Sequence, residues 1–371
     1  MKNSRILVIG GGIGGLTSAI ALRRKGFDVE IIERDPHWSV YGVGIIQQSN
    51  VVREMAALEL LENYLDAGFG FDFVEIYMPD GDLAARIPSP KLAGDGPANV
   101  GISRRALQNV LGDRAKALGT KIRLGVTADS FDDDGEGVVV RFSDETEDRY
   151  DLVIGADGIY SQTRSMIFPD APKAEFVGQA VWRYNLPRPA DLDCLQSYQT
   201  SVGVGLVQLS EDLMYMFVTT PEPGNPRYPR EGLAARMRSK IEGLPPAIRE
   251  LGEQITNDDE VVYKPLEWVF VTGEWHKGRI VLLGDAIHAT TPHLGQGAGM
   301  AIEDSIVLAE ELERAATPDE AFRAYRERRI ERARFIVETS LAICRSQLGT
   351  GPFVDQAKAV HDMFAVVSEP I

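Results

Sequence analysis

The chain has 371 residues, 44% hydrophobic and 25% charged, with a formal net charge of −16. This composition is typical of a globular protein with a large core. The negative charge argues against unspecific binding to nucleic acid or to an anionic membrane surface, and no apolar run is long enough to span a bilayer. The two cysteines lie far apart without metal-ligand spacing, so we expect reduced thiols and no metal site. No signal peptide is recognised, which makes a cytoplasmic location the default expectation.

The first functional feature is a glycine-rich turn after a strand expected at residues 5–9. Gly10, Gly12 and Gly15 occupy the G-x-G-x-x-G positions, where the first glycine allows the tight turn, the second lets backbone approach a pyrophosphate, and the third lets helix and strand pack closely. Free N–H groups at the start of the following helix favour phosphate. A second β-branched run ends at Glu33, whose carboxylate can accept from ribose hydroxyls. This register predicts a dinucleotide site for NAD or FAD.

Residues 41–46 form a glycine-bearing stretch that leads into a helix expected at 50–61. Gly42 and Gly44 would suit backbone lying against a flat ring, although a plain connection would look the same. Residues 73–88 are expected to form a β-hairpin around a Pro-Asp-Gly turn.

A further helix is expected to begin after Ser103 and to run to about Leu118. Arg104 lies in its first turn, where the helix dipole disfavours a cation, so this arginine either answers an anion such as a cofactor phosphate or is simply solvated. A buried strand at 150–154 then ends in Gly155-Ala156-Asp157-Gly158. In a doubly wound sheet, ligand contacts lie at such carboxyl ends of strands.

From about residue 173 to 267 the pattern changes to alternating strands, a proline-rich linker and a helix at 231–241, which indicates a second, mixed-sheet substrate domain. Joining it to the 73–88 hairpin makes the dinucleotide-binding domain discontinuous. The expected divisions are 1–72, 98–172 and 268–345 for the dinucleotide-binding domain with C-terminal helices, 73–97 and 173–267 for the substrate domain, and 346–371 for a C-terminal tail.

The chain then returns to a buried strand at 279–283 that ends in Gly284-Asp285. A glycine-rich loop with two histidines leads into helices expected at 300–315 and 318–344. Three glycine and acid sites thus lie at the ends of buried strands, counting the first glycine turn and Asp157-Gly158.

These three sites, in this order, resemble the single-component FAD-dependent aromatic hydroxylases of the para-hydroxybenzoate and salicylate hydroxylase type. GADGIYSQTR at 155–164 and GDAIHATTPHLGQGAGMAIED at 284–304 are similar to the family's second and third signatures, and residues 102–107 are similar to its S-R-x-x-L helix start. Trp182-Arg183 is similar to the W-R pair of salicylate-hydroxylase-like members. The resemblance covers roughly residues 4 to 340 and implies an α/β fold: a Rossmann-like FAD-binding domain with an inserted mixed β-sheet substrate domain and C-terminal helices.

The resemblance also implies roles for single residues. Glu33 and Arg34 would hold the adenosine half, Asp285 would bond the ribityl chain, and Asp157-Gly158 would serve both FAD and a transiently bound NAD(P)H. The helix expected at 300–315 would point its N-terminus at flavin N1 and O2. The cofactor-binding residues expected on this basis are Gly10, Gly12, Gly14, Gly15, Glu33, Arg34, Gly44, Arg104, Asp157, Gly158, Asp285, Pro292, Gly295, Gly297, Ala298 and Gly299.

The implied function is that of an FAD monooxygenase, dependent on NAD(P)H and O₂, that hydroxylates a small aromatic or heteroaromatic molecule through a C4a-hydroperoxyflavin. Tyr215 and Arg183 are candidate substrate contacts, with His293 behind them, although each can equally be structural. Two alternatives remain: a flavin-dependent reductase or dehydrogenase of the same fold acting on an isoprenoid or secondary metabolite, and a non-catalytic flavin-fold binding protein. We expect a monomer or a homodimer.

Overall fold

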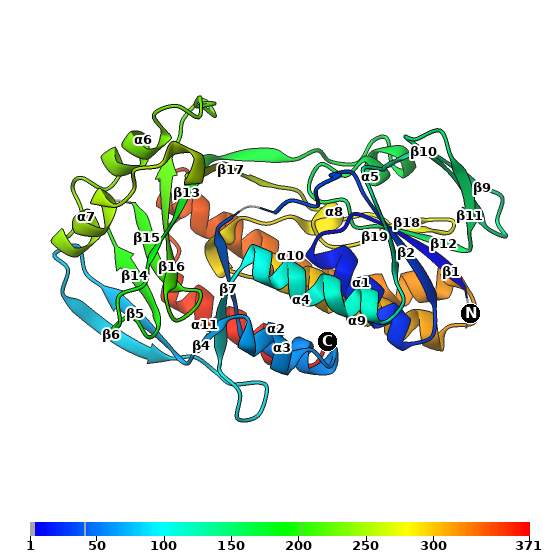
Figure 1. The fold of residues 1–371 in the computed structure, drawn as a ribbon, viewed down its shortest axis with the longest axis horizontal. Coiled ribbons are helices and arrows are strands. Elements are labelled where there is room, and N and C mark those ends of the chain that lie inside the picture. Colours follow the sequence, from blue (N-terminus) through cyan, green and yellow to red (C-terminus); the bar gives the residue numbers. More distant parts are fainter. Residues whose placement is uncertain (1–3, 41, 201) are drawn as a thin grey trace.

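A computed structural model describes residues 4–40, 42–200 and 202–371; residue 41, in the expected glycine stretch, lies outside them. Figure 1 shows helices and two large sheets at opposite ends of an elongated molecule. One sheet has six strands and the other seven. The predicted α/β class with an inserted mixed sheet is therefore confirmed.

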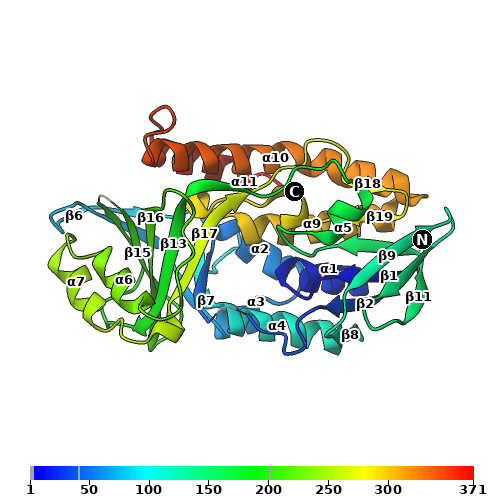
Figure 2. The same cartoon turned by 90° about the horizontal axis from the view of Figure 1, so that it is seen from above.

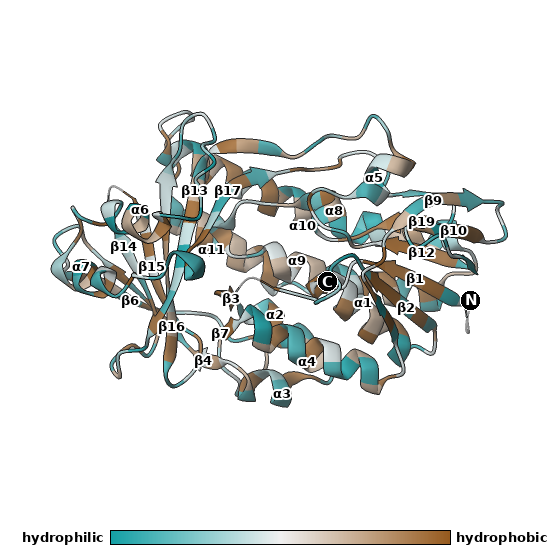
Figure 3. Ribbon diagram, turned by 45° about the horizontal axis from the view of Figure 1, so that its top comes forward, coloured by the Kyte–Doolittle hydropathy of each residue, from teal (hydrophilic) through white to brown (hydrophobic). Residues whose placement is uncertain are grey.

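The six-stranded sheet is parallel except for one edge strand. Its strands, in spatial order, are β18 (His276–Lys277), β19 (Ile280–Leu282), β12 (Leu152–Gly155), β1 (Arg5–Ile9), β2 (Asp28–Glu33) and β8 (Lys121–Leu124). Apolar runs concentrate in β1, β2 and β12 (Figure 3), as is typical of strands buried on both faces. The helices α1 (Ile13–Arg24), α4 (Arg104–Ala117) and α9 (Gly297–Arg314) pack together beside this sheet (Figure 1).

The seven-stranded sheet combines strands from distant parts of the chain. In spatial order these are β17 (Val262–Trp268), β13 (Glu175–Pro187), β16 (Leu213–Pro221), β15 (Gly203–Gln208), β14 (Leu195–Gln199), β5 (Phe73–Tyr77) and β6 (Leu83–Pro88). The predicted hairpin is thus confirmed, and its strand β5 joins β14 in parallel. Figure 2 shows α6 (Leu233–Ser239) and α7 (Pro246–Glu253) on one side of this sheet.

Smaller elements complete the fold. They are the sheet of β3 (Gly44–Gln47), β7 (Asn99–Ser103) and β4 (Phe69–Phe71), the sheet of β11 (Glu147–Tyr150), β10 (Val138–Phe142) and β9 (Ala128–Asp133), the short 3₁₀ turns η1 (Asp258–Glu260) and η2 (Pro292–Leu294), and the helices α2 (Ser49–Ala57), α3 (Leu61–Asp66), α5 (Gln162–Ile167), α8 (Asp285–His288), α10 (Pro318–Gln347) and α11 (Gln356–Ser368). Of the helices in the described ranges, none combines the length and the apolar character that a membrane crossing requires.

Several element boundaries differ from the sequence prediction. The helix expected at 50–61 is interrupted between α2 and α3, because Glu59 adopts a left-handed conformation with φ 58°. Helix α9 begins at Gly297 instead of Met300, so the glycines that were expected in a loop form its first turn. Ser103 caps α4 as predicted, since its hydroxyl accepts from the N–H of Ala106 at 3.1 Å.

A fully buried charge network joins three helices of the C-terminal half. Asp304 in α9 accepts from the Arg329 guanidinium of α10 at 2.8 Å, lies 2.6 Å from His288 Nε2 of α8, and accepts from the N–H of Gly284 at 3.1 Å. Glu303 forms a second ion pair with Arg329 at 2.6 Å. Burial opposes ionisation of Asp304, but His288 and Arg329 outweigh it and lower its pKa to about 2. The network therefore contains a carboxylate that is charged at neutral pH although solvent does not reach it.

We expect Asp304→Ala to lower the free energy of unfolding by about 3–5 kcal/mol, because it leaves buried partners unpaired. The matched control is Asp362→Ala, which removes an exposed pair with Lys358 in α11 and should cost less than about 0.5 kcal/mol. Urea unfolding of the apoprotein measures both. Equal unfolding midpoints for the two variants would contradict the structural importance given to Asp304.

Candidate active site

Of the three glycines in the G-x-G-x-x-G positions of the first turn, one borders open space and two are sterically required. Gly10 has φ 108°, and a Cβ there would lie 2.4 Å from the Ala156 carbonyl oxygen. A Cβ on Gly15 would lie 1.8 Å from the Gly10 carbonyl oxygen, whereas a Cβ on Gly12 would meet nothing within 4 Å. Gly10 and Gly15 are thus required by the fold itself, while Gly12 borders free space.

Side chains from three elements hold this turn in place. The N–H of Gly11 donates to the Glu33 carboxylate at 2.8 Å, and the Gly11 carbonyl accepts from the Trp38 indole at 2.8 Å and from the Gln108 amide at 3.1 Å. Arg34 beside Glu33 is exposed. Within the described residues no side chain caps α1, so its first N–H groups remain available to an anion. The arrangement suits a pyrophosphate.

The second motif mainly supports the local backbone. The Asp157 carboxylate accepts from the Ser161 hydroxyl at 2.5 Å and from the N–H of Thr163 at 2.9 Å, which stabilises the start of α5. Gly158 has φ 81°, as the turn requires. Buried Arg164 donates to the Ala286 carbonyl at 2.8 Å and thereby joins the second motif to the third.

Asp285 combines solvent contact with enclosure by protein. Its side chain is exposed, yet burial raises the pKa of its carboxyl, against the opposing influence of His288 and Arg104. Both facts hold for a carboxylate that faces an interior, solvent-accessible space. Asp285 follows Gly284, which has φ 63° and is held by Asp304. This placement suits a hydrogen bond to a polar ligand chain.

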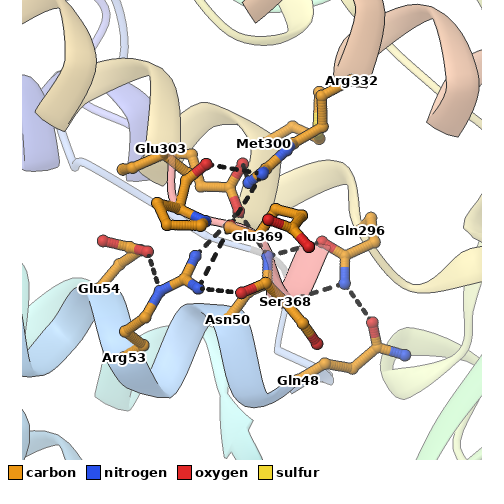
Figure 4. A network of polar contacts seen from close by, with 12 residues as sticks. Gln48, Asn50, Arg53, Glu54, Gln296, Met300, Glu303, Arg332, Ser368 and Glu369 are labelled. Carbon is orange, nitrogen blue, oxygen red and sulfur yellow. Dashed lines mark hydrogen bonds and ion pairs between the residues drawn. The ribbon is translucent and has the colours of Figure 1, made fainter. Parts of the chain in front are cut away.

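The start of α9 is fixed from α2 by amide side chains (Figure 4). Asn50 donates to the Gln296 side chain at 3.0 Å and to Glu303 at 2.9 Å, and Gln296 donates back to Asn50 at 3.1 Å and also to Gln48. Gly295 adopts φ 68° at the end of η2, which Pro292 begins. Gly297, Ala298 and Gly299 form the first turn of α9, and no described side chain caps it.

Arg183, Tyr215 and Arg104 lie close enough together for their charges to influence one another. Burial lowers the pKa of Arg183 to about 10, and Tyr215 partly offsets this, while the charge on Arg104 lowers it further. No carboxylate among the described residues forms an ion pair with Arg183. Burial raises the pKa of the Tyr215 hydroxyl, although Arg183 and Arg104 oppose the shift. A Cβ on Gly44 would lie 2.7 Å from the Tyr215 ring, so β3 packs directly against it.

His293 is engaged by protein groups at both ring nitrogens. Nδ1 lies 2.9 Å from the Thr291 hydroxyl and Nε2 lies 3.2 Å from the Gln347 side-chain oxygen. Burial lowers the pKa of His293 to about 4, so the ring is neutral at pH 7. This geometry favours a positioning role for His293 over that of a base. A catalytic role for this residue stays a prediction.

Sequence reasoning assigned no role to several residues that shape the site. Asp304 and Arg329 lie 25 positions apart on different helices, and Gln108 and Trp38 reach Gly11 from separate elements. An available signal was the pair Glu303-Asp304 inside an otherwise apolar helix face, because buried acids require partners. The partner arginine itself carried no local signal.

Similarity to known proteins shows the family of this chain. The sequence profile of the family described as "FAD binding domain" matches residues 3–340. YetM of Bacillus subtilis is 31% identical, with 98% of this chain and 99% of that protein covered, and the 6-hydroxynicotinate 3-monooxygenase of Bordetella bronchiseptica is 30% identical, with 89% and 88% covered. The crystal structure of a single-residue variant of Klebsiella pneumoniae HpxO with FAD superimposes with a TM-score of 0.85 at 25% identity, over 99% of this chain and 95% of that one. The chain therefore belongs to the FAD-dependent monooxygenases that share this FAD-binding domain.

Proposed function

We propose that FAD lies along the three strand-end motifs, with its pyrophosphate at Gly12 and the start of α1. The free space at Gly12 and the uncapped helix start support this placement, because both favour a close-lying anion. The adenosine half would contact Glu33 and Arg34, the ribityl chain Asp285, and the flavin the first turn of α9. Arg104 supplies a positive charge near Asp285. The remaining expected contacts, from Gly44, Asp157, Gly158 and the 292–299 loop, are part of the same proposal.

Bound FAD supplies hydride acceptance from NAD(P)H and activation of O₂. The protein's task is then to orient a ring, to exclude water and to stabilise charge. The seven-stranded sheet forms the wall of the proposed site that carries Arg183 and Tyr215. The first turn of α9 supplies N–H groups that would stabilise negative charge on the flavin. We further propose that NAD(P)H binds transiently at the surface. The division into two domains, a monomeric or homodimeric state and a cytoplasmic location are parts of the same proposal.

We infer an anionic aromatic or heteroaromatic substrate. The observation that carries this inference is Arg183, an enclosed guanidinium without an ion-pair partner among the described residues. A buried cation of this kind is stabilised when an anion reaches it. A relative named for 6-hydroxynicotinate supports a ring that bears a carboxylate, which this arginine would hold while Tyr215 packs beside it.

Gly12→Val should abolish FAD retention without destabilising the apoprotein, because its Cβ meets no protein atom but would block a pyrophosphate. Gly15→Ala is the contrasting control: it should lower the melting temperature of the apoprotein, since its Cβ would collide with Gly10. FAD per chain after gel filtration and apoprotein melting temperature are measured for both. Normal FAD content in the Gly12 variant would refute this placement of the pyrophosphate.

Substrate should accelerate reduction of the bound flavin, because a ring that binds one flavin position more tightly than another shifts their populations. Arg183→Met should raise the concentration of an anionic ring that gives half-maximal acceleration about 10- to 100-fold, because a charge-assisted hydrogen bond is lost. The corresponding concentration of its neutral amide analogue should rise much less. Stopped-flow reduction at fixed NADPH, with 6-hydroxynicotinate and its amide, measures both.

Fast flavin reduction without any ligand, unchanged across a panel of aromatic acids, would instead support the reductase alternative. An equal effect of Arg183→Met on the acid and on the amide would remove Arg183 from the substrate site.

A further inference from the structure

The two faces of the seven-stranded sheet are covered differently. On one face Trp182, Met216 and Val218 are buried beneath α6 and α7 (Figure 2). The opposite face, which carries Arg183 and Tyr215, extends to the edge strand β6 with apolar side chains that remain half-buried or exposed. We call this set the open face: Val74, Ile76, Ile87, Leu195 and Phe217.

Strand register shows that the open face is continuous with Arg183. Arg183 in β13 pairs with Phe217 in β16, Phe217 with Gly205 in β15, Gly205 with Ser197 in β14, and Ser197 with Ile76 in β5. Directly paired residues project to the same side of a sheet. One row therefore runs from the guanidinium across four further strands, a span of about 19 Å at roughly 4.8 Å per strand.

Within this row the side chains are apolar or small. A Cβ on Gly205 would lie 2.3 Å from the Phe217 ring, so the glycine lets the ring lie flat across β15. The ring is partly exposed, and its centroid lies 6.1 Å from that of Tyr215. Beyond it, Ile87 on the edge strand pairs with Val74 and is 48% exposed. An apolar surface thus begins beside the charged group and leads away from it.

We propose that the open face extends the substrate site and holds an apolar extension of the substrate, such as an alkyl chain or a second ring. This inference rests on the proposed function, in which Arg183 holds the anionic ring. The occupant is an amphipathic aromatic anion, because one row of side chains offers a cation at one end and apolar surface along the rest. Contiguous exposed apolar surface of this kind marks a binding site.

Calorimetric titration of the FAD-loaded enzyme tests the proposal with salicylate and 6-hydroxynicotinate, each unsubstituted and with butyl or hexyl chains. Each added CH₂ should lower Kd about two- to fourfold in the wild type. Ile76→Ser should bring the ratio of Kd between unsubstituted and hexyl ligands towards one. Phe73→Ser is the matched control, since Phe73 is a half-exposed residue on the opposite face of the same strand and its loss should leave that ratio intact.

A wild-type Kd that does not depend on chain length, or the same dependence in Ile76→Ser, would overturn the inference. Sedimentation would overturn it as well if Ile76→Ser converted a dimer into a monomer, because the open face would then join two copies. Failure of the proposed function would give a different result. Unsubstituted acids would then either not bind to the wild type or bind equally well to the Arg183→Met variant. Arg183-dependent binding of unsubstituted acids without any gain from the chains refutes the extension alone.

Discussion

The buried Asp304 carboxylate is the constraint on which the site geometry depends. It holds the N–H of Gly284, the ring of His288 and the guanidinium of Arg329, so a single group aligns α8, α9 and α10. Removing any partner would leave charge or polar atoms buried without compensation, and such loss is strongly destabilising. The turn that presents Asp285 and the first turn of α9 are therefore fixed relative to each other before any ligand binds. This is preorganisation achieved through ionic contacts.

The charges of the site differ in sign from those of the whole chain. The protein carries a formal net charge of −16, yet the interior site presents Arg104, the enclosed Arg183 and two uncapped helix starts. Each of these favours an anion. Asp285 contributes an acceptor for a polar group. A cofactor with a pyrophosphate and a substrate with a carboxylate fit this distribution.

The sequence predicted those features that depend on local sterics or on local hydrogen bonds. Gly15 followed from a contact within one turn, the cap at Ser103 from its neighbours, and the 73–88 hairpin from its turn residues. Features set by tertiary partners were missed. The pairing of Asp304 with Arg329 joins separate helices, and both helix α11 and strand β14 lacked a distinctive pattern. Roles in catalysis for Tyr215, Arg183 and His293 stay predictions, because their chemistry depends on a bound substrate.

The proposed function requires that this site insert one oxygen atom into an aromatic ring. Incubation of the FAD-loaded enzyme with NADPH, ¹⁸O₂ and the aromatic acid that most strongly stimulates flavin reduction tests it directly. Mass spectrometry of the product should show a single ¹⁸O atom for each molecule of NADPH consumed. Unlabelled organic product, or NADPH consumption matched entirely by H₂O₂, would contradict the claim.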